Sequence, residues 1–286
     1  MQAGPELSIV MINYNAKELT AQAVDSIFAV SPQLSFEIVL VENGDRPEEQ
    51  FPGRPGVTVL RNVENHGFGH ACNTGAAAAK GNCLLFLNND TIMHPGTLEA
   101  CTAYLKENPR TGGLGARTLL ADGTLDHACK RGFPTPMASL YYFTGMDRRH
   151  PKSRRYGAYR QTFLPEDAVA PVDSVAGSFL MMPRRVFEQA GGFDETFFMY
   201  GEDIDLCYRV KQAGYEIVYY GAASLTHLKG QSGLHTKSRR VIRQFYDAMA
   251  LFYNKHYRGL YPRPVSWAVL SAIWAKRTLS LIRARN

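Results

Sequence analysis

The chain has 286 residues, of which 45% are hydrophobic and 20% are charged, enough apolar material for the core of one large or two small domains. Its five cysteines form no CxxC pair and their number is odd, which argues against a zinc site or a disulfide framework and favours a reducing compartment. Residues 1–6 lack the basic and apolar regions of a secretory signal, and no run of eighteen apolar residues predicts a membrane-spanning helix.

The net charge of +6 is unevenly distributed along the chain. Residues 228–286 contain twelve Lys and Arg residues and one acid, Asp247, so their net charge is +11. Residues 1–227 therefore carry a net charge of −5. A basic segment beside an acidic body indicates an anionic partner for that segment. Phospholipid headgroups, a lipid diphosphate and nucleic acid are the candidates.

The first 110 residues alternate between short apolar runs and helical patterns. Four apolar runs predict buried strands: Leu7–Ile12, Phe36–Val41, Val57–Leu60 and Cys83–Leu87. Helical spacing or composition predicts helices over Ala16–Val30, Gly69–Lys80 and Pro95–Asn108. This alternation predicts an α/β fold with a mostly parallel sheet, right-handed crossovers and helices on both faces.

Polar clusters follow three of these strands: Asn13-Tyr14-Asn15, Glu42-Asn43 and Asn88-Asn89-Asp90. In an open parallel sheet, ligands bind outside the carboxyl ends of the strands. Each cluster alone could be a turn that uses Asn and Asp for local hydrogen bonds. Together they favour one site built from several strand ends.

The chain has no glycine-rich phosphate loop. It contains no GxxxxGK[ST] sequence, and Gly67-Phe68-Gly69 lacks the third glycine of a dinucleotide fingerprint. A phosphate-bearing ligand would therefore need another positively charged partner, and a divalent metal is the natural one. Asp90 could supply a carboxylate to Mg²⁺ or Mn²⁺, and His227 an imidazole to Mn²⁺, although a lone histidine is more often structural.

The second half of the chain is less regular. Residues 112–171 are rich in Gly, Pro, Arg and aromatics without a sustained period, which predicts a long loop or insertion there, with the loop near 130–170. This loop would be either a lid near the site or a solvated surface loop. Further on, the pattern predicts a strand over Val172–Met182 containing Gly177, a helix over Arg184–Ala190, a helix from Glu202 to Ala213 and a strand over Glu216–Tyr220.

Glu202 and Asp203 form an acidic pair at the start of a predicted helix. Carboxylates at this position are stabilised by the helix dipole, which is a sufficient structural reason for them. One of them could instead accept a proton from a sugar hydroxyl as a general base. Because adjacent helical residues point in different directions, we expect at most one to do so.

The chain from about Ser238 is predicted to be helical. Its apolar stretch Val265–Ala275 carries Trp267 and Trp274 and is followed by basic residues, which fits interfacial membrane binding or a helix packed on the domain. We therefore divide the chain into a domain over 1–227, with halves 1–110 and 111–227, and a basic helical extension over 228–286.

With these features the chain resembles the family-2 glycosyltransferases, particularly the branch with bacterial rhamnosyltransferases of cell-surface polysaccharide assembly. The resemblance covers Leu7 to His227. Its marks are Ile9–Asn15, Val41–Gly44, Asn65–Gly75, Leu87–Thr91, Gly177–Met181, Gly191–Glu195 and Tyr200–Leu206.

The resemblance implies a GT-A fold, inverting transfer from a nucleotide-sugar, and a role for most of these residues. Asn88-Asn89-Asp90 stands in place of the family's DxD motif, so Asp90 becomes the main metal carboxylate and His227 a second ligand for Mn²⁺ or Mg²⁺. Asp203 matches the base position better than Glu202. The residues implied to line the nucleotide-sugar site are Asn13, Tyr14, Asn15, Glu42, Asn43, Asn65, Gly67, Phe68, Asn73, Asn88, Asn89 and Gly177.

On family grounds, the first choice of donor is dTDP-rhamnose, with UDP-linked galactose, glucose or N-acetylglucosamine as alternatives. The implied acceptor is a glycan or a polyprenyl-diphosphate-linked sugar at the cytoplasmic face of the inner membrane. The basic extension would contact that membrane. Two other classes stay open. A non-catalytic nucleotide-sugar or nucleic-acid binding protein is disfavoured by the acidic body and the retained acids. A nucleotidyltransferase would need a glycine-rich, basic loop after the first strand.

Overall fold

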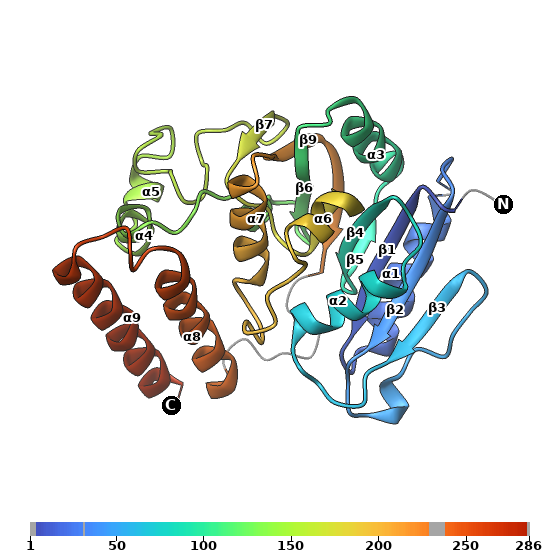
Figure 1. The fold of residues 1–286 in the computed structure, drawn as a ribbon, viewed down its shortest axis with the longest axis horizontal. Coiled ribbons are helices and arrows are strands. Elements are labelled where there is room, and N and C mark those ends of the chain that lie inside the picture. The colour runs from blue at the N-terminus through green and yellow to red at the C-terminus, as the bar shows by residue number, and fades with distance from the viewer. Residues whose placement is uncertain (1–3, 31, 229–237, 285–286) are drawn as a thin grey trace.

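A computed structural model describes residues 4–30, 32–228 and 238–284. Their strands form one sheet in the order β3-β2-β1-β4-β8-β6-β9-β5, and β7 pairs with β9 (Figure 1). The strands are β1 Leu7–Asn13, β2 Phe36–Glu42, β3 Val57–Arg61, β4 Cys83–Asn88, β5 Thr91–Met93, β6 Thr111–Leu120, β7 Val169–Val172, β8 Phe179–Pro183 and β9 Glu216–His227.

The amino-terminal half of the sheet is parallel, as the sequence predicts. β1 lies between β2 and β4, and Ile12 pairs with both Val41 and Asn88. The three strands therefore end at the same level, which places their polar ends along one edge. The other half is mixed, because β8 runs antiparallel to β4 and β6 while β9 runs parallel to β6.

Helices cover both faces of the sheet, which confirms the predicted layers (Figure 1). One face packs against α1 (Lys17–Ala29) and α3 (Thr97–Glu107). The other face packs against α2 (Phe68–Ala78), α6 (Arg184–Gln189) and α7 (Glu202–Gln212). Two single-turn 3₁₀ helices, η1 (Pro47–Glu49) and η2 (His127–Cys129), lie in the connections.

The prediction of a long loop over 112–171 is wrong at its start, because β6 is an inner strand of the sheet. Its glycines made it resemble a loop, but they are required by close packing. A Cβ atom at Gly112 would lie 2.5 Å from the Cβ of Tyr215, and one at Gly115 would lie 2.6 Å from the Cβ of Val175. Glycine in a strand marks such close approaches.

Three other boundaries differ from the sequence predictions. The strand predicted over 172–182 is not continuous, because β7 ends at Val172, β8 begins at Phe179, and the two pair with different neighbours. β9 is longer than Glu216–Tyr220 and contains His227 as its last residue. Pro95 precedes the helix it was expected to begin, because the N-cap of α3 is Gly96.

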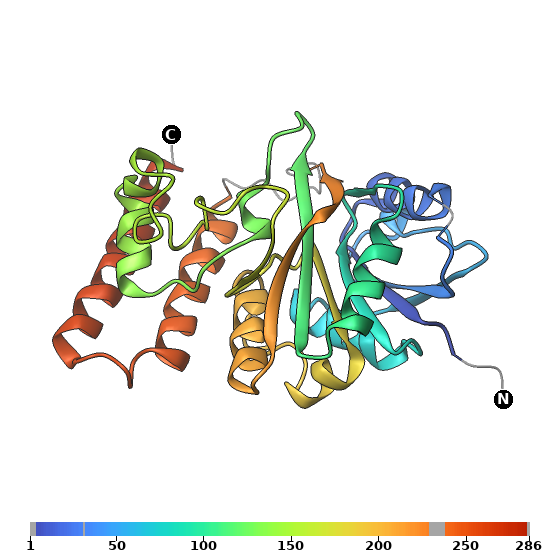
Figure 2. The same cartoon turned by 90° about the horizontal axis from the view of Figure 1, so that it is seen from above.

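The segment 130–170 also contains regular structure, namely the short helices α4 (Pro136–Phe143) and α5 (Met146–Arg149). The ammonium group of Lys276 lies 4.1 Å from the ring centroid of Phe143, so α4 contacts the carboxyl-terminal helix. Figure 2 shows the two elements side by side, away from the parallel half of the sheet. This segment is therefore a packed insertion in part.

The predicted helical extension is confirmed as α8 (Arg239–His256) and α9 (Arg263–Arg283). α8 is held against α7 by buried apolar side chains and by Asp205, which pairs with Lys255 at 2.7 Å and His256 at 2.6 Å. α9 packs on α8 through Ile273 and leaves Trp267 68% exposed. None of the helices in the described ranges is long and apolar enough to cross a membrane. The boundary at residue 227 stays a prediction.

Candidate active site

Asp90 and His227, the two predicted metal ligands, lie together at the carboxyl edge of the sheet. Asp90 follows β4, and the pairing of β5 with β9 places Thr91 opposite His227. The Nε2 atom of His227 lies 3.0 Å from Oδ1 of Asp90, and both side chains are buried. The Nδ2 atom of Asn88 lies 3.5 Å from the same imidazole nitrogen. β5, a strand that sequence patterns missed, is what aligns this pair.

Asp126 completes this arrangement from the other side of the imidazole. Its Oδ2 atom lies 3.3 Å from Nδ1 of His227, and it is buried. Burial lowers the pKa of His227, but the hydrogen bonds and charges of Asp126 and Asp90 outweigh burial and raise that pKa to about 9. The sequence analysis did not single out Asp126, which lies in the segment that lacks a pattern.

The geometry of the pair suits a divalent ion. Two ligands at right angles, each ~2.1 Å from an octahedral ion, are ~3.0 Å apart, which is the scale of the Asp90–His227 separation. In the described ranges no group of three His, Cys, Asp or Glu side chains could hold a metal by itself. An ion here would need further oxygen ligands from substrate and water, which is usual for Mg²⁺.

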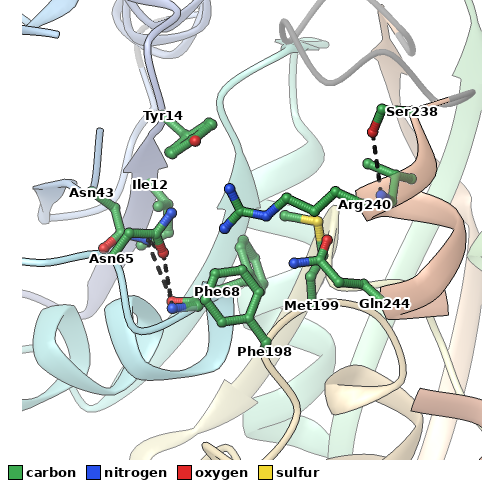
Figure 3. Close-up of a pocket in the computed structure, with 12 residues that line it drawn as sticks. Ile12, Tyr14, Asn43, Asn65, Phe68, Phe198, Met199, Ser238, Arg240 and Gln244 are labelled. Carbon is green, nitrogen blue, oxygen red and sulfur yellow. Dashed lines mark hydrogen bonds between the residues drawn. The ribbon is translucent and has the colours of Figure 1, made fainter. Parts of the chain in front are cut away.

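A pocket at the same edge of the sheet, lined in part by Ile12 of β1, contains five of the predicted nucleotide-sugar residues (Figure 3). They are Tyr14, Asn43, Asn65, Gly67 and Phe68. The amides form a network in which Asn43 donates to Oδ1 of Asn65 at 3.0 Å. Gly67 has φ of +104°, and a Cβ atom there would lie 2.3 Å from the carbonyl oxygen of Phe198, so only glycine fits. The aromatic rings and amides are groups that can stack on and hydrogen-bond to a nucleobase.

Three other predicted nucleotide-sugar residues are engaged within the protein. Asn13 donates to Glu42 at 2.9 Å, and Glu42 accepts from the backbone N–H of Phe51 at 2.6 Å. Asn89 donates to the hydroxyl of Thr20, which in turn donates to Asn13. Burial raises the pKa of the Glu42 carboxyl. These residues hold the loops after β1, β2 and β4, and their contact with a nucleotide stays a prediction.

The remaining predicted residues are spread around the edge. Asn15, with φ of +52°, donates to Asp45 at 2.7 Å. Asn73 donates to the carbonyl of Phe193 and to Glu195, which ties α2 to the segment before α7. Gly177 lies where the pocket approaches the acidic pair, because a Cβ atom there would lie 3.6 Å from both Phe68 and Asp203.

The two adjacent acids have different environments. The Oδ2 atom of Asp203 accepts from Arg131 at 2.6 Å and from the backbone N–H of Gly177 at 3.0 Å. Oε2 of Glu202 is buried and accepts no hydrogen bond from any described residue. Burial, and to a lesser degree the charge of Asp203, raises the pKa of Glu202 to about 8. Burial therefore favours the protonated form of Glu202, beside an Asp203 that is ion-paired with Arg131. Sequence reasoning missed Arg131.

Comparison with known protein families decides the class. Residues 8–165, more than half of the chain, match the family model described as glycosyl transferase family 2. The chain belongs to this family. Residues 163–231 also match the model described as the N-terminal domain of galactosyltransferase. The protein is thus a glycosyltransferase, as the sequence motifs indicate.

Of three curated relatives of this glycosyltransferase, two are named as rhamnosyltransferases and one as an O-antigen biosynthesis protein. It is 25% identical to N-acetylglucosaminyl-diphospho-decaprenol L-rhamnosyltransferase of Mycobacterium tuberculosis, over 97% of this chain and 93% of that protein. It is 31% identical to rhamnosyltransferase WbbL of Escherichia coli, over 57% of this chain and 61% of that protein. It is 30% identical to the O-antigen biosynthesis protein RfbC of Myxococcus xanthus, over 80% of this chain but only 18% of that protein.

Solved structures confirm the GT-A fold. GalNAc-T7, crystallised with UDP, GalNAc and Mn²⁺, matches 91% of this chain and 52% of that chain with a TM-score of 0.61 and 16% identity. The mannosyltransferase PcManGT of Pyrobaculum calidifontis, in complex with GDP-Man and Mn²⁺, matches 99% of this chain and 74% of that chain with a TM-score of 0.58 and 15% identity.

Proposed function

We propose that this glycosyltransferase moves L-rhamnose from dTDP-rhamnose to a polyprenyl-diphosphate-linked sugar, in cell-surface polysaccharide assembly. One observation carries the proposal: the relative named N-acetylglucosaminyl-diphospho-decaprenol L-rhamnosyltransferase matches nearly the whole length of both chains. The match therefore includes the acceptor half and the helical extension as well as the donor half. UDP-linked galactose, glucose and N-acetylglucosamine are the alternative donors.

In the proposed site, Asp90 and His227 hold Mn²⁺ or Mg²⁺, and Asp126 fixes the orientation of the imidazole. Their separation and burial support this role. A divalent ion bound there would neutralise charge on the departing nucleotide diphosphate. The pocket at the same edge of the sheet, which contains Tyr14, Asn43 and Asn65, takes the nucleoside. Two structural neighbours carry Mn²⁺ in their crystals, which agrees with this assignment.

In the proposed mechanism, Asp203 accepts the proton of the acceptor hydroxyl while the sugar is transferred with inversion. Asp203 is ion-paired with Arg131, whereas burial raises the pKa of Glu202 and favours its protonated form. A base must be ionised to accept a proton, so this difference favours Asp203 over its neighbour. Arg131 and the N–H of Gly177 hold the orientation of the carboxylate.

We place the enzyme at the cytoplasmic face of the inner membrane, with α9 against the lipid. Trp267, Leu279 and Ile282 are each more than half exposed on this helix. Lys276 and Arg277 lie between them in the sequence, and Arg277 stacks on the ring of Trp274. Apolar and basic side chains on one helix fit binding to the interface of an anionic membrane. The cysteines, which are all unpaired and buried, agree with a reducing compartment.

A thermal-shift series tests the donor assignment. The wild-type protein is heated with dTDP, UDP, GDP and the corresponding nucleotide-sugars, each with Mn²⁺ or with EDTA. We expect dTDP-rhamnose with Mn²⁺ to give the largest rise in melting temperature. A larger rise with a UDP-sugar would replace rhamnose by that sugar. Binding of nucleotide-sugar without any turnover in the presence of acceptor would favour the non-catalytic alternative.

A further inference from the structure

The first turns of α8 form one wall of the nucleotide pocket. Arg240, Val241 and Gln244 line it. Figure 3 shows Arg240 on the opposite side of the opening from Tyr14 and Asn65. The side chain of Arg240 extends into the pocket in this view, and its guanidinium carbon lies 5.5 Å from the ring centroid of Phe198. The basic extension, which the sequence suggests as a membrane contact, thus also reaches the donor pocket.

Arg240 brings a positive charge to a pocket whose other described lining residues are uncharged. Among the described residues that line the pocket, Arg240 carries the one charged side chain, and the others are amides, aromatics and small or apolar groups. Within the described ranges no carboxylate forms an ion pair with Arg240. The charge of Arg240 acts on Asp45 at longer range, where it is the smallest of the effects that lower the pKa of the Asp45 carboxyl. An exposed guanidinium in a neutral pocket is suited to an anion.

The strand register links one wall of the pocket to the proposed metal pair. Ile12 lines the pocket and pairs in register with Asn88, whose amide lies 3.5 Å from His227. Neighbouring strands are only ~4.8 Å apart. The phosphates of a nucleoside diphosphate bound with its base at the amide network would then lie between Arg240 and Asp90.

The position of Arg240 is fixed by the packing of α8. The hydroxyl of Ser238 caps the helix by accepting from the N–H of Val241 at 3.2 Å. At the other end of α8, His256 and Lys255 both pair with the buried Asp205 of α7. The buried cluster between them includes Phe197, which is adjacent to the pocket residue Phe198. The guanidinium of Arg240 is therefore carried by a helix that is anchored to α7.

We propose that Arg240 binds the diphosphate of the nucleotide-sugar, on the side of the pocket opposite Asp90, so that α8 is part of the donor site. The inference rests on the proposed function. The guanidinium donates to phosphate oxygens, and Gln244, one turn further along α8, offers an amide donor beside it. Arg240 and a metal held by Asp90 and His227 would then each neutralise part of the negative charge of the diphosphate.

Isothermal titration of the full chain tests this inference. The ligands are the nucleoside diphosphate that binds wild type best, chosen from dTDP, UDP and GDP, and its nucleoside, both in EDTA so that the metal pair does not contribute. We expect Arg240→Gln to weaken the diphosphate about 10- to 100-fold, the range for hydrogen bonds to a charged group, and to leave the nucleoside unchanged. Arg243→Gln, an exposed residue on the same helix outside the pocket lining, is the control and should change neither.

Two results would overturn the inference. Equal affinity of Arg240→Gln and wild type for the diphosphate would leave Arg240 as a stacking partner of Phe198 only. Equal losses for nucleoside and diphosphate would place Arg240 at the base. Because Arg240 is exposed, the unliganded melting temperature of the variant should match wild type, which confirms folding. If wild type itself binds none of the three diphosphates, with or without Mn²⁺, the proposed function fails rather than this inference.

Discussion

Arg131 donates a hydrogen bond from Nη2 to Oδ2 of Asp203 at 2.6 Å, and both side chains are nearly buried. The pair joins the segment after β6 to the first turn of α7. It holds the carboxylate of the proposed base in a fixed orientation. The carboxylate also accepts from the backbone of Gly177, so its position is set by two elements outside its own helix.

Replacing Asp203 by Asn should lower turnover about 10²- to 10⁴-fold, the usual contribution of a general base. Affinity for the nucleoside diphosphate should be unchanged, because Asp203 does not line the pocket. The variant also leaves the buried guanidinium of Arg131 without a carboxylate to balance its charge, at a cost of up to ~3–5 kcal/mol in the free energy of unfolding. Adding Arg131→Gln should restore part of this stability but no turnover. Near-wild-type turnover in Asp203→Asn would show that another group takes the proton.

Glu202→Gln should leave turnover at pH 7 within a few-fold of wild type, because the glutamine has the shape of the protonated carboxyl. It should also change the dependence of stability on pH. The pKa of Glu202 rises from 4.5 to about 8 on folding, so wild type loses stability as pH rises through this range. Chemical denaturation at pH 5, 6.5 and 8 should show a smaller decline for the variant. A loss of turnover as large as that of Asp203→Asn would instead make Glu202 the base.

Asp126→Asn should weaken Mn²⁺ binding about 10- to 100-fold, as loss of a carboxylate that orients a histidine ligand does. Electron paramagnetic resonance of Mn²⁺ in the presence of nucleoside diphosphate measures this without turnover. Because His227 must lose a proton to bind metal and its pKa is about 9, affinity in wild type should rise between pH 6 and 9. Asp122→Asn, an exposed residue on the adjacent turn, should have no effect. Unchanged Mn²⁺ affinity in Asp126→Asn would remove its role beside the metal.

Replacing Trp267 and Leu279 by Ser should weaken binding to phosphatidylglycerol vesicles by at least about tenfold, since both apolar side chains would otherwise be buried in lipid. Co-sedimentation with vesicles measures this. Substitution is a sharper test than deleting residues 264–286, because deletion would also uncover the α8 surface that packs on Ile273. Val63→Ser, a fully exposed residue on another element, serves as the control. Equal vesicle binding by all variants would mean that α9 has a structural role only.

The parallel half of the fold and the grouping of its polar ends follow from the sequence. Buried parallel strands are continuous apolar runs, and their carboxyl ends must meet at one edge, so the placement of Asn43 and Asn88 at the same edge is a consequence of topology. The glycosyltransferase class followed from the order and spacing of motifs. The site residues that these patterns located are those that directly follow strands or begin helices.

The residues that the sequence did not reveal lie in segments without a recognisable local pattern. Asp126 and Arg131 follow β6, whose glycines hide a strand because they fit close to Tyr215 and Val175 rather than form turns. Arg240 lies on α8 close to other basic residues, and their spacing does not indicate which of them lines a pocket and which faces solvent. Their roles depend on which distant element packs beside them, and a single sequence does not contain that information in local form.

Transfer to a lipid-linked acceptor is the decisive measurement. The full chain is incubated with Mn²⁺, polyprenyl-diphosphate-linked N-acetylglucosamine and either dTDP-rhamnose or a UDP-sugar, and the lipid product is analysed by mass spectrometry, with Asp203→Asn in parallel. We expect a deoxyhexose to be added by wild type from dTDP-rhamnose and not by the variant. Addition of no sugar from any donor, or equal addition by Asp203→Asn, would contradict the proposed reaction and its base.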